Sequence, residues 1–193
     1  KCLILTHLYQ ISALKPKKLD RILKSAEYCL SLHLKDDAFG YYRMIIDSLS
    51  VRRRSLEEKK IYIDATLGLL TVHGHLIPHS QQKSLLKRSL RFAEELKDQE
   101  RLARINLAYA QILKTGGDYK TAAILFDKGW SIAQELGRDD LLKKAALSTT
   151  DFLFWQGRVA DAVERYEQVI GNLEEFPSDE GTLRACATLG WCY

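Results

Sequence analysis

Three histidines lie close together in the sequence, and histidine is the commonest metal ligand among protein side chains. They are His73, His75 and His79, arranged around Gly74. A metal site needs three or four converging ligands, and no nearby cysteine or acidic residue completes such a set. The pattern therefore predicts a polar loop, with no metal and no other cofactor.

Ser80 and Lys83 have the serine-x-x-lysine spacing that serves acyl transfer in some hydrolases. The companion motifs of that chemistry are absent from the sequence, so we interpret Ser80 as the N-cap of a helix. The phosphate-binding loop, the dinucleotide-binding fingerprint and the H-E-x-x-H zinc motif are absent as well. We find no catalytic set, and we expect that the chain is not an enzyme.

The basic residues are concentrated in the first half of the chain. Residues 1–100 contain 18 Lys and Arg against 12 Asp and Glu, a net charge of +6, and residues 101–193 contain 11 against 13, or −2. The most basic stretch is Arg52–Arg54. Cations at the end of a helix favour its dipole, but the same run could bind an acidic partner or a phosphate group. Both interpretations stay open.

The composition is that of a folded protein without a membrane span. Hydrophobic residues make up 46% of the chain and charged residues 28%. No apolar run approaches the roughly 18 residues that a membrane helix needs. The four cysteines have no metal-ligand spacing and are expected to be reduced and mostly buried, which favours the cytoplasm. Because the chain lacks an initiating Met and ends within a repeat, we expect a fragment of a longer protein.

The elements that would position any site follow from a repeat of 40 residues. Gly117-Asp118-Tyr119 returns as Gly157-Arg158-Val159, Ala122 as Ala162, and Phe126 as Tyr166. A fixed period of this length predicts a solenoid of stacked helical hairpins, in which each hairpin buries its apolar face against its neighbours. The apolar residues from 102 to 113 recur at intervals of three and four, as in a helix.

The repeat divides the chain into units of two helices with a short turn between them. We expect one helical-repeat domain over 1–193, with units at 22–61, 62–101, 102–141 and 142–181 and a partial unit at 182–193. Gly116-Gly117 should end the first helix of the third unit, and Asp118 should cap the second. Asp139 should cap the helix that follows. In the first unit the turn is expected at Asp36-Asp37.

The turn and second helix of each unit resemble the tetratricopeptide repeat. Gly117, Asp118, Tyr119, Ala122 and Phe126 match its pattern, and Leu189-Gly190 with Tyr193 is similar to its first helix. The family period is about 34 residues, so these units are longer. The long period is similar to the repeats of large bacterial signalling ATPases and LuxR-type transcription regulators. The resemblance implies an all-α fold, a right-handed superhelix of antiparallel helical hairpins.

In that family, ligands lie on the face made by the first helix of each unit. The matching positions mix cations with large aromatic groups, as binding surfaces do. The alternative is that the aromatic residues pack between repeats. We predict a binding surface from Arg104, Gln111, Lys114, Lys144, Asp151, Phe154, Trp155, Arg184 and Trp191.

We expect the chain to recognise a protein, peptide or ligand as a segment of a larger cytoplasmic signalling or transcription regulator. The partner could be another domain of the same protein. One alternative is a plain scaffold that assembles a complex, and another is a nucleic-acid-binding repeat. The latter should show variable polar pairs at fixed positions, and Leu107 and Leu147 do not supply them. We therefore expect neither nucleic acid nor membrane as the partner of this segment.

Overall fold

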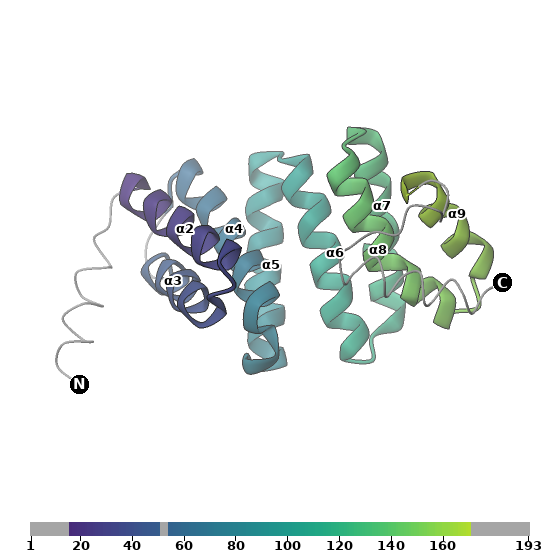
Figure 1. Ribbon diagram of the computed structural model, residues 1–193, viewed down its shortest axis with the longest axis horizontal. Coiled ribbons are helices and arrows are strands. Elements are labelled where there is room, and N and C mark those ends of the chain that lie inside the picture. Colours follow the sequence, from purple (N-terminus) through teal and green to yellow (C-terminus); the bar gives the residue numbers. More distant parts are fainter. Residues whose placement is uncertain (1–15, 51–53, 171–193) are drawn as a thin grey trace. The chain divides into compact units, whose positions relative to one another are not determined.

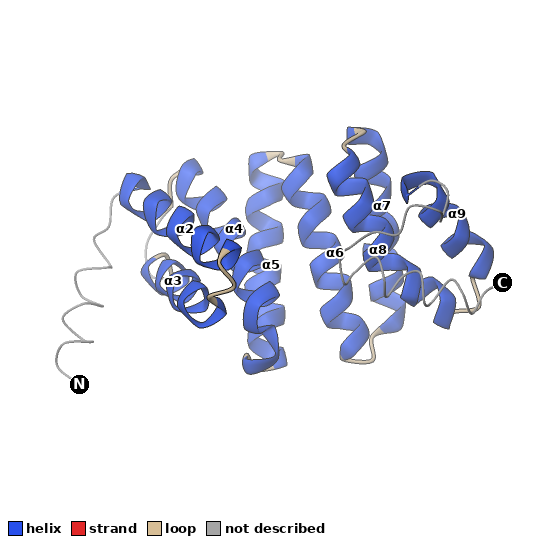
Figure 2. Cartoon of the chain, in the orientation of Figure 1, coloured by secondary structure: helices blue, strands red, loops and turns tan. Residues whose placement is uncertain are grey.

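Helices form nearly all of the computed structural model, which describes residues 16–50 and 54–170 (Figure 2). They are α2 (Pro16–Ser31), α3 (Lys35–Ser48), α4 (Leu56–His73), the 3-10 helix η1 (Gly74–Leu76), α5 (His79–Leu96), α6 (Gln99–Thr115), α7 (Tyr119–Leu136), α8 (Asp139–Trp155) and α9 (Val159–Ile170). Over these two ranges the structure has no strand, which confirms the all-α prediction. Nor does any helix there have the length and apolar character of a membrane span.

The chain divides into two compact units, 1–101 and 102–193. In the first unit α3 packs against both α2 and α4, α2 also contacts α4, and α4 packs against α5 (Figure 1). In the second unit α8 packs against α7 and α9. In each unit these helices thus pack on neighbours in the chain, as helical hairpins do.

Glycine ends the first helix of the hairpin at two positions, as the sequence predicted. Gly117 has φ +82° and Gly157 has φ +74°. After each glycine the backbone N–H donates to a carbonyl of the last helical turn, from Asp118 to Leu113 at 3.0 Å and from Arg158 to Leu153 at 2.9 Å. The carboxylate of Asp118 then accepts from the Thr121 N–H at 3.2 Å, so the predicted N-cap is confirmed.

Replacing Gly117 by valine should lower the free energy of unfolding by about 1–2 kcal/mol. Apart from its chain neighbours, no described residue lies within 4 Å of the position that a Cβ would occupy, so the cost comes from the positive φ alone. Chemical denaturation followed by circular dichroism would measure it. Gly117→Asn is the matched control, because asparagine tolerates this conformation, and it should lose clearly less. Equal losses in the two variants would contradict a backbone origin.

Three other helix ends differ from the sequence prediction. Asp36 and Asp37 lie in the first turn of α3, and the turn before it is made by His33, whose φ is +60°. The N-cap of α5 is Pro78, with no side-chain hydrogen bond, so Ser80 is not the cap. Asp139 is the first residue of α8, and Arg138 holds the N-cap position.

The sequence places the arginine run at the C-terminal end of a helix, but Arg54 and Ser55 directly precede the first residue of α4. Ser55 caps α4, since its hydroxyl accepts from the Glu58 N–H while the Glu58 carboxylate accepts from the Ser55 N–H at 2.9 Å. The helix pairs also begin earlier than the expected units, α4 at Leu56 and α6 at Gln99.

Small residues allow the helices to approach closely. Ala122 and Ala162, which occupy the same position of successive repeats, are fully buried. A Cβ on Gly129 of α7 would lie 2.9 Å from the Leu107 side chain of α6. A Cβ on Gly68 of α4 would lie 2.3 Å from the ring of Tyr42 on α3. At these two glycines the neighbouring helix occupies the space that any larger side chain would need.

Ion pairs join helices that are distant in sequence. In the first unit the Arg101 guanidinium contacts Asp64 at 2.5 Å and Asp98 at 2.7 Å. Burial alone would raise the pKa of Asp98, but the hydrogen bonds from Arg101 outweigh it and hold this pKa below its usual value. In the second unit Arg165 of α9 contacts Asp127 of α7 at 2.6 Å. These side chains are partly buried, so their pairing helps to fix the spacing of the helices.

Candidate functional site

Seven of the nine predicted binding residues lie in the described part of the chain. Two helices supply them, α6 with Arg104, Gln111 and Lys114, and α8 with Lys144, Asp151, Phe154 and Trp155. Their spacing places them on one face of each helix. Arg184 and Trp191 lie outside the described residues.

Lys114 and Asp151 form a contact between α6 and α8. The ammonium of Lys114 lies 3.4 Å from the Asp151 carboxylate, and the two side chains are only 18% and 27% exposed. The two charges largely neutralise each other. Two members of the predicted surface are therefore paired with each other.

Arg104 of α6 and Lys144 of α8 place two positive charges near each other. Burial lowers the pKa of the Lys144 ammonium, and the positive charge of nearby Arg104 lowers it further. Lys144 as a residue remains exposed, whereas Arg104 is half-buried. Lys144 makes no ion pair with any residue in 16–50 or 54–170.

The aromatic part of the face lies at the C-terminal end of α8. The Trp155 side chain is 78% exposed, and its ring meets that of Phe154 edge to face with centroids 5.5 Å apart. Phe154 is half-buried and Gln111 is exposed. Within the described ranges, most of the Trp155 surface faces solvent.

The His73 side chain contacts other residues of the first unit. Nε2 of His73 lies 2.8 Å from the Asp36 carboxylate, and its ring meets those of Phe39 and His75 edge to face. The segment after His73 is the short helix η1. Among the described residues no three histidine, cysteine or acidic side chains gather as metal ligands would. Of the cysteines, the structure describes Cys29, which is a half-exposed free thiol.

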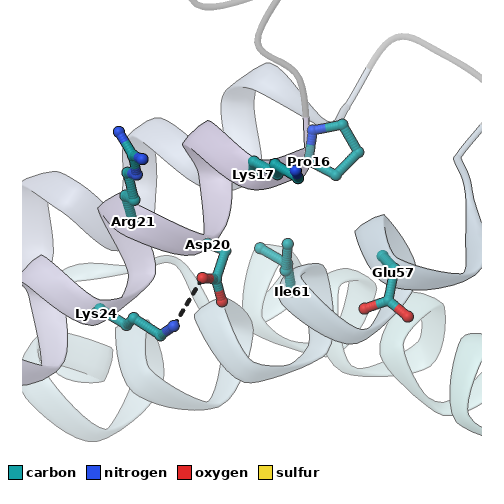
Figure 3. Close-up of a pocket in the computed structure, with 7 residues that line it drawn as sticks. All are labelled: Pro16, Lys17, Asp20, Arg21, Lys24, Glu57 and Ile61. Carbon is teal, nitrogen blue, oxygen red and sulfur yellow. Dashed lines mark ion pairs between the residues drawn. The ribbon is translucent and has the colours of Figure 1, made fainter.

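A pocket that no sequence motif indicated lies between α2 and α4. Its volume is about 420 Å³, and its lining is Pro16, Lys17, Asp20, Arg21, Lys24, Glu57 and Ile61. The Lys24 ammonium contacts the Asp20 carboxylate at 2.9 Å, and Arg21 extends to the other side of α2 (Figure 3). The lining contains charges of both signs, so it selects no single class of ligand.

The comparison with known structures gives one informative likeness. No family model and no curated protein matches the chain. The TPR-like repeats of a protein assigned as a kinesin light chain from Podosopora anserina match with a TM-score of 0.63. The sequences are 17% identical, and the match covers 93% of this chain and 87% of that one. The likeness shows the TPR-like helical-repeat fold that the sequence predicted.

Proposed function

We propose that this chain is a protein-binding helical-repeat segment. Its binding surface, called the α6–α8 face below, consists of Arg104, Gln111 and Lys114 on α6 and Lys144, Asp151, Phe154 and Trp155 on α8. This face binds an extended peptide with acidic and apolar side chains. The exposed Trp155 carries the proposal, because a large aromatic group in solvent is the usual anchor of a protein interface. Lys144 adds a positive charge on the same face, close enough to Arg104 for the two charges to interact. Helical-repeat folds commonly present such surfaces to protein partners.

The spacing of the two features defines the peptide. Lys144 and Trp155 are 11 residues apart on α8, which places them on the same side of the helix about 16 Å apart. An extended chain covers this distance in about five residues. The ligand should therefore present an Asp or Glu about five residues from a large apolar side chain.

The wider setting is a further part of this proposal. The long repeat period is similar to that of bacterial signalling ATPases and LuxR-type regulators. We propose a segment of a larger cytoplasmic regulator, in which the peptide belongs to a partner protein or to another domain of the same chain. A plain scaffold would use the same surface, but its ligand would not alter the activity of any attached domain.

Selection from a library of random 12-residue peptides would test the binding surface. Selected peptides should be enriched in an acidic residue about five positions from an aromatic or aliphatic one. Trp155→Ser should weaken a selected peptide about ten- to thirty-fold by fluorescence anisotropy, because the anchor is lost. Lys144→Gln should weaken it less, and the difference should shrink at high salt.

Tyr119→Ser is the matched control, since Tyr119 is another exposed aromatic residue, at the start of α7. It should change the affinity less than about twofold. If the Trp155 and Tyr119 variants bind selected peptides as tightly as the parent chain, the binding surface lies elsewhere.

A further inference from the structure

Four cations surround one pair of aromatic rings in the α4–α5 hairpin. The rings belong to Tyr62 and Phe92, which are 0% and 3% exposed and meet edge to face with centroids 5.5 Å apart. The cations, called the cation cluster below, are Arg54, Lys59, Arg88 and Arg91. Only Arg54 belongs to the arginine run that the sequence singled out, and Arg52 and Arg53 lie outside the described residues.

The distances show how tightly the charges are gathered. The Arg54 guanidinium carbon lies 5.2 Å from the Tyr62 ring centroid and 5.1 Å from that of Phe92. The Arg88 guanidinium lies 5.9 Å from the Tyr62 ring, and the Arg91 guanidinium lies 5.6 Å from the Phe92 ring. The Lys59 ammonium lies 5.8 Å from the same Phe92 ring. Favourable cation–π contacts thus hold four like charges around two touching rings.

Two carboxylates offset this charge only in part. Glu95 contacts Lys59 at 2.6 Å and Arg91 at 3.7 Å. Glu58 is almost fully buried, and its negative charge attracts the Arg54 guanidinium. Its carboxylate also accepts a hydrogen bond from the Ser55 N–H. Among the described residues, four cations and two carboxylates leave an excess of two positive charges. Arg88 has no ion pair within the part of the chain that the structure describes.

Arg54 is the member of the cation cluster on which the repulsion between like charges has the clearest effect. Burial lowers the pKa of its guanidinium, and the like charges of Arg88 and Arg91 lower it further. One terminal nitrogen donates to the Leu49 carbonyl, whereas the buried Nε–H has no hydrogen-bond partner among the described residues. Any group that brings two negative charges and several acceptor oxygens to this position would relieve the repulsion.

We propose that the cation cluster binds a phosphate monoester. Such a group carries about two negative charges near pH 7, equal to the excess of the cluster, and offers three acceptor oxygens. Planar guanidinium groups match phosphate oxygens two at a time, and the cluster contains three of them. Because the two rings are buried, a ligand cannot stack on them, and charge and hydrogen bonds must supply the affinity.

Titration calorimetry on the 193-residue chain would test the site, with inorganic phosphate and a phosphoserine pentapeptide as probes. Both should bind at neutral pH. Dimethyl phosphate, a singly charged diester, should bind at least about tenfold more weakly at equal ionic strength. A phosphopeptide that binds about tenfold more tightly than inorganic phosphate would identify a phosphorylated chain as the natural source. Equal affinities would identify the free anion. Either result supports the site.

Arg88→Gln should weaken both phosphate probes about tenfold or more, because it removes the cation that has no carboxylate partner. Lys87→Gln is the matched control, since it removes an exposed charge from the adjacent position of α5, and it should change affinity less than about twofold. Arg88 lies against a buried ring, so Arg91→Gln provides a second variant, with a side chain that is 66% exposed. It should weaken binding about threefold or more while the circular dichroism spectrum stays unchanged.

Three results would overturn the proposal. The first is no binding of either phosphate probe to the parent chain. The second is parent-like affinity in both the Arg88 and the Arg91 variants. The third is equal or tighter binding of dimethyl phosphate, which would assign the cluster to phosphodiesters and hence to nucleic acid.

Discussion

Phe126→Ala is expected to lower the free energy of unfolding by about 3–5 kcal/mol, the usual cost of removing a fully buried ring. Phe126 is 1% exposed on α7, and its ring centroid lies 4.9 Å from that of Phe152 on α8. Phe152 is itself 3% exposed, so the surrounding helices can close only part of the resulting cavity. The variant loses both the transfer energy of the ring and the packing between two hairpins.

Urea denaturation followed by the helical signal in far-ultraviolet circular dichroism would measure this loss. The control is Ile124→Ala on the same helix, because Ile124 is 66% exposed. It should change the free energy of unfolding by less than about 0.5 kcal/mol. Equal losses in the two variants would show that α7 does not bury the face that the structure assigns to it.

Gly68→Val is expected to destabilise the first unit by about 3 kcal/mol, at the upper end of overpacking effects. A Cβ at this position would lie 2.3 Å from the Tyr42 ring, far inside contact distance. Tyr42 is 3% exposed and cannot swing into solvent without opening the α3–α4 packing. The intrinsic preference of helices for other residues over glycine is smaller, at most about 1 kcal/mol, so the steric term decides the sign.

Gly40→Ala provides the matched control with the opposite sign. Gly40 also lies inside a helix, α3, but nothing lies within 4 Å of its Cβ position. This variant should gain about 0.5–1 kcal/mol, since alanine loses less conformational freedom on folding. Thermal and urea denaturation of both variants would compare them. A stabilised Gly68 variant would contradict the close approach of α3 and α4.

Much of the second unit could be predicted because its signals are local. Gly117 supplies the left-handed residue, Asp118 caps within three residues, and Ala122 and Phe126 repeat after 40 residues on the buried side of their helices. Each of these features depends on backbone geometry or on helical period, and both are visible in a short stretch of sequence.

The first unit was harder because its helix ends use residues that do not usually mark them. His33 and Lys97 take the left-handed conformation at φ +60° and +52°, a role that the sequence pattern assigns to glycine. Asp36-Asp37 looked like a turn, but acidic residues also favour the first turn of a helix, and they lie there in α3. The local sequence is compatible with either a turn or a helix start at these residues, and the packing of the whole unit decides between them.

For the candidate site, the sequence predicted which residues share a helix face but not how they pair. Helical period alone puts Lys114 and Asp151 on the faces of their own helices. Whether their charges meet depends on the spacing and offset of α6 and α8, and these follow from the residues packed beneath, such as Gly129 against Leu107. The aromatic partners of Arg54 escaped prediction for the same reason.

The ion pairs between distant helices also limit how such a chain can evolve in length. The partners in Asp64–Arg101, Lys114–Asp151 and Asp127–Arg165 are 37, 37 and 38 residues apart, close to the repeat length. Duplication of a whole repeat would give the new hairpin charged partners at the same separation. An insertion or deletion of a few residues within a helix would shift one member of the pair around its helix axis and separate the charges. Growth and loss by whole hairpins therefore preserve these electrostatic links, whereas smaller changes within the helices do not.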